Sequence, residues 1–166
     1  KMQKRKKYIA YGSNLNLNQM AGRCPTAKVV GKGEIKDYEL LFRGYNGSAV
    51  ATVEPRKGAS VPVLIWEIGP DDEGRLDVYE GYPRLYGKTD LEVQTENGCE
   101  SIMAYTMNDR YHIGMPSDIY LETIRKGYQD GGFDTAVLMD SVSHCREVAV
   151  QELEGAEENT WTQHLL

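Results

Sequence analysis

The sequence predicts an α+β domain built on a curled or closed mixed sheet that is packed by helices. Most of the chain consists of short strand-like segments separated by turn residues, and only a few stretches have helical spacing. One helix interrupts the strands after the first of them, another lies near the middle, and the last helices come at the C-terminal end. A chain of 166 residues suits one domain, which can bury about two-thirds of its unfolded surface without a metal or a disulfide.

The N-terminal half is predicted to contain strands and one short helix. The apolar pair Tyr8-Ile9 makes residues 7–12 the first strand, and Leu15, Leu17 and Met20 give residues 14–22 the spacing of a helix. The further predicted strands are residues 27–30 and 34–42, around a turn at 31–33, and residues 48–53 and 61–68, around a loop at 54–58.

The C-terminal half is predicted to be mostly helical around one hairpin. Pro70 suits the first turn of a helix over residues 70–80, and the acidic residues 71–73 lie where the helix dipole favours negative charge. Residues 85–94 and 100–107 form a predicted hairpin across Asn97-Gly98. Helices are expected at 116–129, with Ser117 or Asp118 near the start, and over most of 133–151.

Charge is unevenly distributed along the chain. The net charge is −6, and five of the 19 basic residues lie in the first seven positions, so the remainder carries 14 basic and 25 acidic residues, a net −11. An acidic body of this kind argues against nucleic-acid binding. We expect one domain over residues 7–151, a solvated basic tail at 1–6 that includes a residue left over from expression, and an acidic C-terminal tail at 152–166.

The cysteines and the hydropathy predict a cytoplasmic protein. Cys24, Cys99 and Cys145 are odd in number and widely spaced, so they match neither a zinc site nor a disulfide framework, and reduced thiols are expected. No segment approaches the length of a membrane span, and no apolar signal-peptide core follows the basic start. We therefore expect no membrane partner.

The most informative segment is the tract Tyr11-Gly12-Ser13-Asn14-Leu15, between the first strand and the first helix. Backbone amides at a helix start are unpaired, so such a turn favours a carboxylate, a phosphate or a developing oxyanion. Gly12 allows a ligand close to the backbone, and Ser13 or Asn14 can cap the helix and donate to a ligand. An ordinary capped helix would explain the same residues without a ligand.

Glu80 is the second candidate functional residue. Leu76, Tyr79 and Glu80 share one face of the predicted helix, and Leu76 and Tyr79 are expected to face the core. Glu80 then lies at the margin of the apolar stripe and in the last helical turn, where burial and the dipole both raise the pKa of a carboxyl group. Such a pKa suits acid–base catalysis at neutral pH. A surface glutamate at a frayed helix end is the alternative.

Together these segments resemble the γ-glutamylcyclotransferase family, also called AIG2-like. The resemblance covers residues 8–130, most of the chain. Weaker support comes from Arg23-Cys24-Pro25, from the strand-like stretches 38–43 and 61–68, and from residues 116–127. The main matches, in chain order, are the tract Tyr11 to Leu15, then Leu76-Asp77-Val78-Tyr79-Glu80-Gly81, and then Tyr86.

The resemblance implies a small mixed β-barrel with flanking helices and a ligand pocket at one end. It implies an enzyme without metal or cofactor, which releases 5-oxoproline and a free amine or amino acid from a small γ-glutamyl amide. Independently of the resemblance, the many tyrosines are expected mainly in the core and the pocket wall; they include Tyr8, Tyr11, Tyr79, Tyr82, Tyr86 and Tyr105. The residues matching the substrate-holding loop are Tyr11, Gly12, Ser13, Asn14 and Leu15; Glu80 matches the catalytic acid–base, and Tyr86 and Tyr120 match tyrosines lining the pocket.

This chemistry agrees with the residues themselves. A carboxylate can take a proton from the substrate α-amine, which then attacks the γ-carbonyl, and the same group can protonate the departing amine, a contribution of about 10²–10⁴ in rate. The alternative is a non-catalytic binding module for γ-glutamyl or similar acyl-amino-acid ligands; a glutamate at position 80 favours the enzyme. Tyr82 and Pro83, which follow Glu80, leave the identity of the leaving amine open, and the sequence does not distinguish a monomer from a homodimer.

Overall fold

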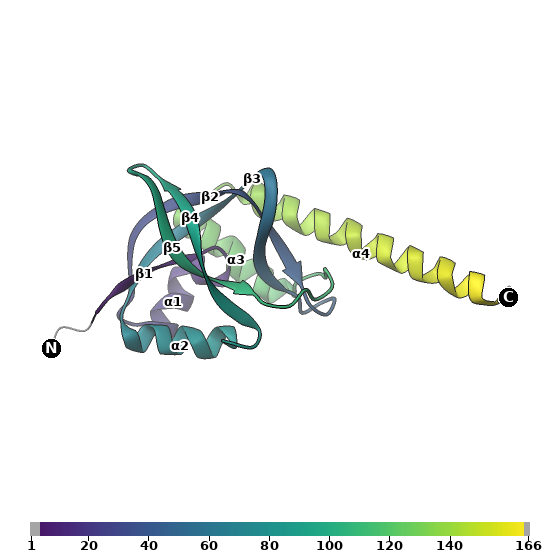
Figure 1. Cartoon of the computed structure of the whole chain (residues 1–166), viewed down its shortest axis with the longest axis horizontal. Helices are drawn as coiled ribbons and strands as arrows, with labels where there is room; N and C mark the ends of the chain where they lie inside the picture. The colour runs from purple at the N-terminus through teal and green to yellow at the C-terminus, as the bar shows by residue number, and fades with distance from the viewer. Residues whose placement is uncertain (1–3, 165–166) are drawn as a thin grey trace.

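Five strands close into a barrel in the order β1-β3-β2-β4-β5, and helices flank it (Figure 1). The computed structural model describes residues 4–164. The predicted α+β class with a closed mixed barrel is therefore confirmed. The strands are β1 (Lys6–Ala10), β2 (Lys28–Arg43), β3 (Val50–Ile68), β4 (Tyr86–Thr95) and β5 (Gly98–Met107); the helices are a 3-10 turn η1 (Ser13–Leu15), α1 (Leu17–Arg23), α2 (Pro70–Glu80), α3 (Asp118–Gly131) and α4 (Thr135–His164).

The first strand makes the sheet mixed. β1 pairs antiparallel with β3 and parallel with β5, where Tyr8 lies opposite Met103. The other pairs, β2 with β3, β2 with β4 and β4 with β5, are antiparallel. The barrel closes between β2 and β4 at Glu34, which pairs with Gln94.

The predicted turn at residues 31–33 is wrong, because β2 runs through it without a break. The glycine at position 33 serves a different purpose. A Cβ placed on Gly33 would lie 2.4 Å from the carbonyl oxygen of Gln94 and 2.8 Å from a methyl of Val93. Glycine inside a strand marks a close backbone approach, and here that approach is the contact between β2 and β4.

The predicted loop at residues 54–58 is also wrong, because β3 continues through it. The pairing of β2 with β3 shifts register between Lys36 and Tyr38, so the segment is a bulge within one long hairpin. Asp37 has a φ of 61°, and its Oδ1 accepts a hydrogen bond of 2.8 Å from the Gly58 amide. Turn-forming residues therefore bend the long hairpin without ending its strands.

The predictions for the second half hold more closely. Helix α2 has the predicted bounds, and the hairpin of β4 and β5 is present, with residues 96 and 97 as its turn because Thr95 pairs with Gly98. The N-cap of α3 is Ser117, whose side chain accepts from the Tyr120 amide. Its C-cap is Gly132 in the left-handed conformation.

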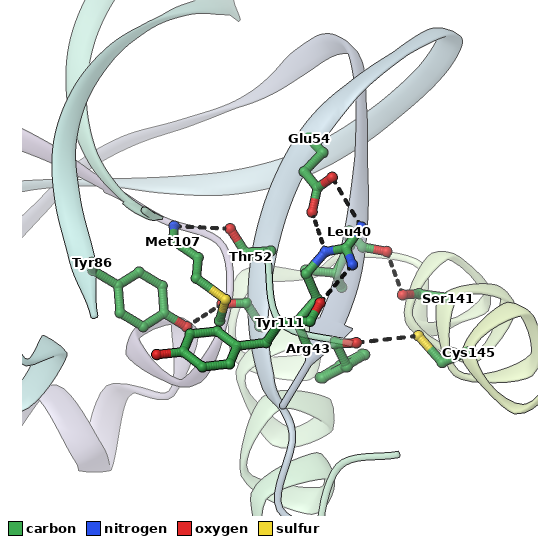
Figure 2. A network of polar contacts seen from close by, with 11 residues as sticks. Leu40, Arg43, Thr52, Glu54, Tyr86, Met107, Tyr111, Ser141 and Cys145 are labelled. Atoms are coloured by element: carbon green, nitrogen blue, oxygen red, sulfur yellow. Dashed lines mark hydrogen bonds and ion pairs between the residues drawn. The ribbon is translucent and has the colours of Figure 1, made fainter. Parts of the chain in front are cut away.

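The last helix is longer than predicted, since α4 continues to His164 through much of the expected acidic tail. Its first turns pack on the barrel through buried Leu138, Val142 and Cys145. Two contacts fix it to β2: the Ser141 hydroxyl donates to the Leu40 carbonyl, and the Cys145 thiol approaches the Phe42 carbonyl (Figure 2). The rest of α4 extends away from the barrel (Figure 1).

Basic residues near the N-terminus are held by ion pairs, although residues 1–6 were expected to form a solvated tail. Arg5 Nε lies 2.6 Å from Glu67 Oε1. Lys6 pairs with Glu73, and Lys7 Nζ lies 2.8 Å from Glu100 Oε1; the last pair joins β1 to β5. Arg5 is thereby tied to β3, and Lys6, the first residue of β1, is tied to α2.

The three cysteines are free thiols, Cys24 and Cys145 buried and Cys99 exposed. Within residues 4–164 no helix combines the length and the apolar character that crossing a membrane requires.

Candidate active site

A cavity of about 240 Å³ lies where the 11–14 turn, the end of α2 and the barrel wall meet. It brings together residues that are far apart in the sequence, from β1, β3, β4, β5, α2 and α3. Most of the lining side chains are aromatic or aliphatic. The lining residues are Tyr8, Tyr11, Gly12, Ser13, Asn14, Val50, Ala51, Tyr79, Glu80, Leu85, Tyr86, Tyr105 and Tyr120.

The second half of the 11–14 turn forms the start of the 3-10 turn η1, and α1 begins only at Leu17. The first backbone bonds run from the Leu15 amide to the Gly12 carbonyl, 3.0 Å, and from the Asn16 amide to the Ser13 carbonyl, 3.1 Å. The amides of Ser13 and Asn14 precede the first of these donors, so the 3-10 pairing leaves them without an acceptor in the turn.

The cap predicted at Ser13 or Asn14 is wrong, because α1 begins later and Asn16 caps it. The Asn16 side chain accepts a hydrogen bond of 3.0 Å from the Gln19 amide. This shift has a consequence for the site. The side chains of Ser13 and Asn14 do not cap the helix, and both line the cavity.

Buried neighbours hold this turn in place. Trp66 Nε1 donates to the Asn14 carbonyl at 3.1 Å, and Asn16 Nδ2 donates to the Thr123 carbonyl of α3 at 3.1 Å. Leu15 is fully buried and is not among the residues lining the cavity, in contrast to the substrate-binding role implied for it. A Cβ on Gly127 would lie 2.6 Å from Leu15 Cβ, so α3 packs directly on the turn.

Glu80 is the last residue of α2, and Gly81 ends the helix with a φ of 63°. The face predicted for this helix is half correct. Leu76 is fully buried, as expected, but Tyr79 is 42% exposed and lies at the cavity instead of in the core. Glu80 is half-buried and lines the cavity, and only 3.5 Å separate its Oε1 from Asn14 Nδ2.

The surroundings of Glu80 change its acidity. Burial raises the pKa of Glu80 from 4.5 to about 7, and the positive charge of Arg23 opposes this rise. The carboxyl group is therefore divided between its protonated and ionised forms near neutral pH. Such a group can both accept and donate a proton in one catalytic cycle.

Tyr86 and Tyr120 reach the cavity from β4 and α3, and both bind the backbone of Ala51. The Tyr86 hydroxyl donates to the Ala51 carbonyl, and the Ala51 amide donates to the Tyr120 hydroxyl at 3.0 Å. Figure 2 shows the Tyr86 bond and, elsewhere in the same view, Arg43, which joins Glu54 to the Tyr111 carbonyl. The two tyrosines thus fix the β3 wall of the cavity.

Tyr8, Tyr11 and Tyr105 line the cavity together with Tyr79, as expected, whereas Tyr82 is 39% exposed and is not among the lining residues. Asn14 Nδ2 donates to the Tyr8 hydroxyl at 2.8 Å, and the Tyr11 hydroxyl donates to the Tyr105 carbonyl at 2.6 Å. Burial raises the pKa of Tyr8 and of Tyr11 well above the ordinary value, so both hydroxyls are neutral near pH 7. Among the described side chains that line the cavity, Glu80 is therefore the one that carries a formal charge there.

One residue that contacts the cavity lining, Arg23, has no assigned role in the sequence-based prediction. Arg23 lies at the end of α1, donates to Asn14 Oδ1, and lies over the ring of Tyr79. Its position beside Cys24-Pro25 gave a family match but no indication of what it contacts.

As for metals, the described part of the chain has no group of three or more His, Cys, Asp or Glu side chains placed to bind one.

Comparison with known proteins decides the family. The model of the γ-glutamyl cyclotransferase, AIG2-like family matches residues 8–124, a span that includes every residue lining the cavity. The chain belongs to this family. It is 26% identical to γ-glutamylcyclotransferase of Mus musculus over 133 residues, which are 75% of this chain and 71% of that protein. It is 28% identical to γ-glutamylcyclotransferase of Bos taurus over 134 residues, with the same coverage.

Solved structures agree with the fold. One of a γ-glutamyl cyclotransferase matches with a TM-score of 0.72 at 22% identity, covering 88% of this chain and 87% of that one. YkqA from Bacillus subtilis matches with a TM-score of 0.65 at 16% identity, covering 76% of this chain and 49% of that one. At these identities the likeness concerns the barrel and its helices. The AIG2-like barrel implied by the sequence is therefore confirmed.

Proposed function

We propose that the protein is a γ-glutamyl cyclotransferase that converts a γ-glutamyl amide into 5-oxoproline and a free amine or amino acid. One observation carries the proposal. A carboxyl group with a pKa of about 7, that of Glu80, shares a small cavity with the backbone turn at Gly12 to Asn14. The names of the relatives support it.

The reaction begins with a proton transfer. The α-ammonium group of the substrate cannot attack a carbonyl, so ionised Glu80 first takes one of its protons. The free amine then forms a bond to the γ-carbonyl carbon and closes a five-membered ring. The cavity is small and mostly lined by rings and aliphatic groups, so it favours a folded glutamyl chain in which the two reacting atoms are close.

The second half of the reaction uses the same proton. As the bond between the γ-carbon and the amide nitrogen breaks, protonated Glu80 gives its proton to the departing amine. The carboxyl group returns to its ionised form. The ring nitrogen loses its second proton to solvent as the lactam forms, and the released amine takes up a proton from solvent. A pKa of about 7 is suited to both steps, because the acid and the base are each present in quantity at neutral pH.

The 11–14 turn has the donors for the anionic parts of the substrate. The amides of Ser13 and Asn14 lie at the start of the 3-10 turn, and the side chains of both residues line the cavity. We assign them the α-carboxylate or the oxyanion of the tetrahedral intermediate. Loss of one oxyanion donor costs about 10²–10³ in rate in other enzymes.

The test is 5-oxoproline release from a panel of γ-glutamyl amino acids, γ-glutamyl alkylamines, γ-glutamyl-lysine and glutathione. We expect at least one substrate to be turned over, with an acid limb in kcat/KM near pH 7 from Glu80. Glu80→Gln keeps the size of the side chain and is expected to lose at least about a hundredfold in kcat. Glu92→Gln, on the exposed face of β4, is the matched control and should retain full activity.

Two outcomes overturn the proposal. Full activity of Glu80→Gln would remove the carboxyl group from the mechanism. Binding of γ-glutamyl compounds by the parent protein, measured calorimetrically, without product from any of them would identify a binding module instead.

A further inference from the structure

Arg23 is a half-buried residue that does not line the cavity, yet it contacts the residues around the Glu80 carboxylate. Its Nη1 donates to Asn14 Oδ1, and its Nη2 donates to Gln19 Oε1 at 3.0 Å. The guanidinium carbon lies 3.4 Å from the centre of the Tyr79 ring, a stacked arrangement. Arg23 therefore reaches the 11–14 turn and helix α2 at the same time.

The bond from Arg23 determines which way the Asn14 amide points. An amide has an acceptor end and a donor end, whereas a guanidinium group can only donate. Because Arg23 occupies Oδ1, the donor end of Asn14 is turned toward the Tyr8 hydroxyl, at 2.8 Å, and Glu80 Oε1, at 3.5 Å. The opposite orientation would place an amide oxygen against a carboxylate and leave the guanidinium without its acceptor.

The stacking on Tyr79 links the same guanidinium to the end of α2. The Tyr79 hydroxyl and Ser13 Oγ lie 2.8 Å apart and share a hydrogen bond. Tyr79 is the residue before Glu80, so these contacts tie the last turn of α2 to Arg23 and to the 11–14 turn. Arg23 therefore contacts both Asn14 and the end of α2.

We propose that Arg23 is a positioning residue, which orients the Asn14 amide and the end of α2 so that the Glu80 carboxylate is held facing the 11–14 turn. The inference depends on the proposed function for its effect on rate, but not for the orientation itself. Arg23 is outside the cavity, so it acts through Asn14 and Tyr79 and does not touch the substrate.

The charges around Glu80 make the inference measurable. Arg23 lowers the pKa of Glu80, against the effect of burial. Asp77, one turn earlier in α2, is engaged by Lys88 Nζ at 3.0 Å and by the Tyr105 hydroxyl. The other titratable side chains that line the cavity are tyrosines. Burial raises the pKa of five of them, which are neutral near pH 7: Tyr8, Tyr11, Tyr86, Tyr105 and Tyr120. The remaining one is Tyr79.

The first experiment follows the Glu80 carboxyl group by ¹³C NMR through a pH titration of the parent and of Arg23→Met, with Glu80→Gln to assign the signal. Removal of the guanidinium takes away a positive charge and frees the Asn14 amide to rotate, so the pKa of Glu80 is expected to rise. The acid limb of kcat/KM should move to higher pH by the same amount. Arg75 is an exposed arginine of α2 that lines a surface groove together with Arg23. Arg75→Met is therefore the matched control, and it should change neither the pKa of Glu80 nor the acid limb of kcat/KM.

The second experiment asks whether Arg23 acts through Asn14. We expect Arg23→Met to lower kcat roughly tenfold to a hundredfold, the range for a displaced catalytic group. In an Asn14→Ala background the same change should cost at least about threefold less than it does with Asn14 present, because the amide that Arg23 orients is gone and only its contact with Tyr79 and its charge remain. Arg23→Lys keeps the charge but loses the planar donor pair and the stacking, so it should lower kcat with little change in the pKa of Glu80.

Several outcomes would overturn the inference. An unchanged Glu80 titration in Arg23→Met would remove the electrostatic link, and equal losses with and without Asn14 would remove the orienting role. If Arg23→Met does not fold, Arg23→Lys carries the test, and parent-like kcat in that variant would contradict the proposal. Absence of 5-oxoproline from the parent would defeat the proposed function alone, because the titration needs no turnover.

Discussion

The side-chain amide of Asn14 lies 3.5 Å from the carboxylate of Glu80, although 66 positions separate them in the sequence. Asn14 comes from the turn after β1, and Glu80 is the last residue of α2. The contact joins a donor-rich turn to a carboxyl group with a pKa of about 7 at one small cavity. Under the proposed function, a contact of this length can shorten when substrate binds.

The raised pKa of Glu80 predicts how stability depends on pH. The folded protein binds the proton more tightly than the unfolded chain, so the stabilisation is complete below pH 4.5 and is lost as pH rises through about 7. Glu80→Gln removes this loss. We expect the variant to exceed the parent by up to about 3 kcal/mol above pH 8, and by little near pH 4.5, in urea unfolding. A difference that is constant with pH would contradict the prediction, and Glu92→Gln should show none.

Gly127 predicts a coupling between α3 and the 11–14 turn. Gly127→Ala places a methyl group 2.6 Å from Leu15 Cβ and 2.8 Å from the Asn16 amide nitrogen, so the turn must move. We expect a loss of about 1–3 kcal/mol in unfolding free energy and a fall of roughly tenfold or more in kcat. Gly74→Ala, in α2, meets no atom within 4 Å and should gain about 0.5–1 kcal/mol with activity unchanged. Equal behaviour of the two variants would argue against the coupling.

Gly33 predicts where the barrel is sensitive to a single methyl group. In Gly33→Ala the new Cβ would lie 2.4 Å from the Gln94 carbonyl oxygen, so β2 and β4 must separate at the closure of the barrel. We expect a loss of at least about 1–3 kcal/mol in unfolding free energy. Gly31→Ala, two residues earlier on β2, makes only an ordinary contact of 3.6 Å with Ile65 and should change stability by less than about 0.5 kcal/mol. Thermal unfolding of both variants is the measurement. A much larger loss for Gly33→Ala than for Gly31→Ala supports the close contact between β2 and β4, and equal small effects would favour the turn predicted from the sequence.

The hydroxyl of Tyr120 predicts a structural contribution from the cavity wall. Tyr120→Phe leaves the Ala51 amide without its 3.0 Å acceptor in a buried strand. Loss of one partner of a buried hydrogen bond costs about 1–3 kcal/mol. Tyr45→Phe, at a residue that is 88% exposed, is the control and should stay within about 0.5 kcal/mol of the parent in chemical unfolding. If the two variants were equally stable, the Tyr120 hydroxyl would have no such role.

The elements that the sequence predicted well are those whose signals are local. The bounds of α2 follow from Pro70 and from Gly81, and the cap of α3 follows from Ser117. The glycine at position 33 supported a wrong turn prediction for a definite reason. Glycine is favoured both in turns and where two strands approach closely. Only the position of β4, which packs against Gly33, shows that the second explanation holds here.

The candidate site shows the same division. Glu80 and the 11–14 turn could be proposed from chain order and helical spacing, because caps, dipoles and amphipathic faces depend on neighbours within a few residues. Leu15 belongs to the tract that matches the substrate-holding loop, but it packs against α3. Arg23 belongs to the matching tripeptide Arg23-Cys24-Pro25, and the sequence did not indicate that it contacts Asn14. Their roles depend on which surfaces meet after folding.

The sequence by itself determined the fold class, the family resemblance and the two segments that meet at the cavity. The tertiary structure decided that Asn16 caps α1 and leaves Asn14 to the cavity, that Tyr86 and Tyr120 hold Ala51, and that Arg23 reaches both Asn14 and Tyr79. The physical reason is the sequence separation over which each kind of interaction acts. Backbone preferences and capping act over a few residues and can be read along the chain, whereas burial, pKa and hydrogen-bond partners depend on atoms that only the closed barrel brings together.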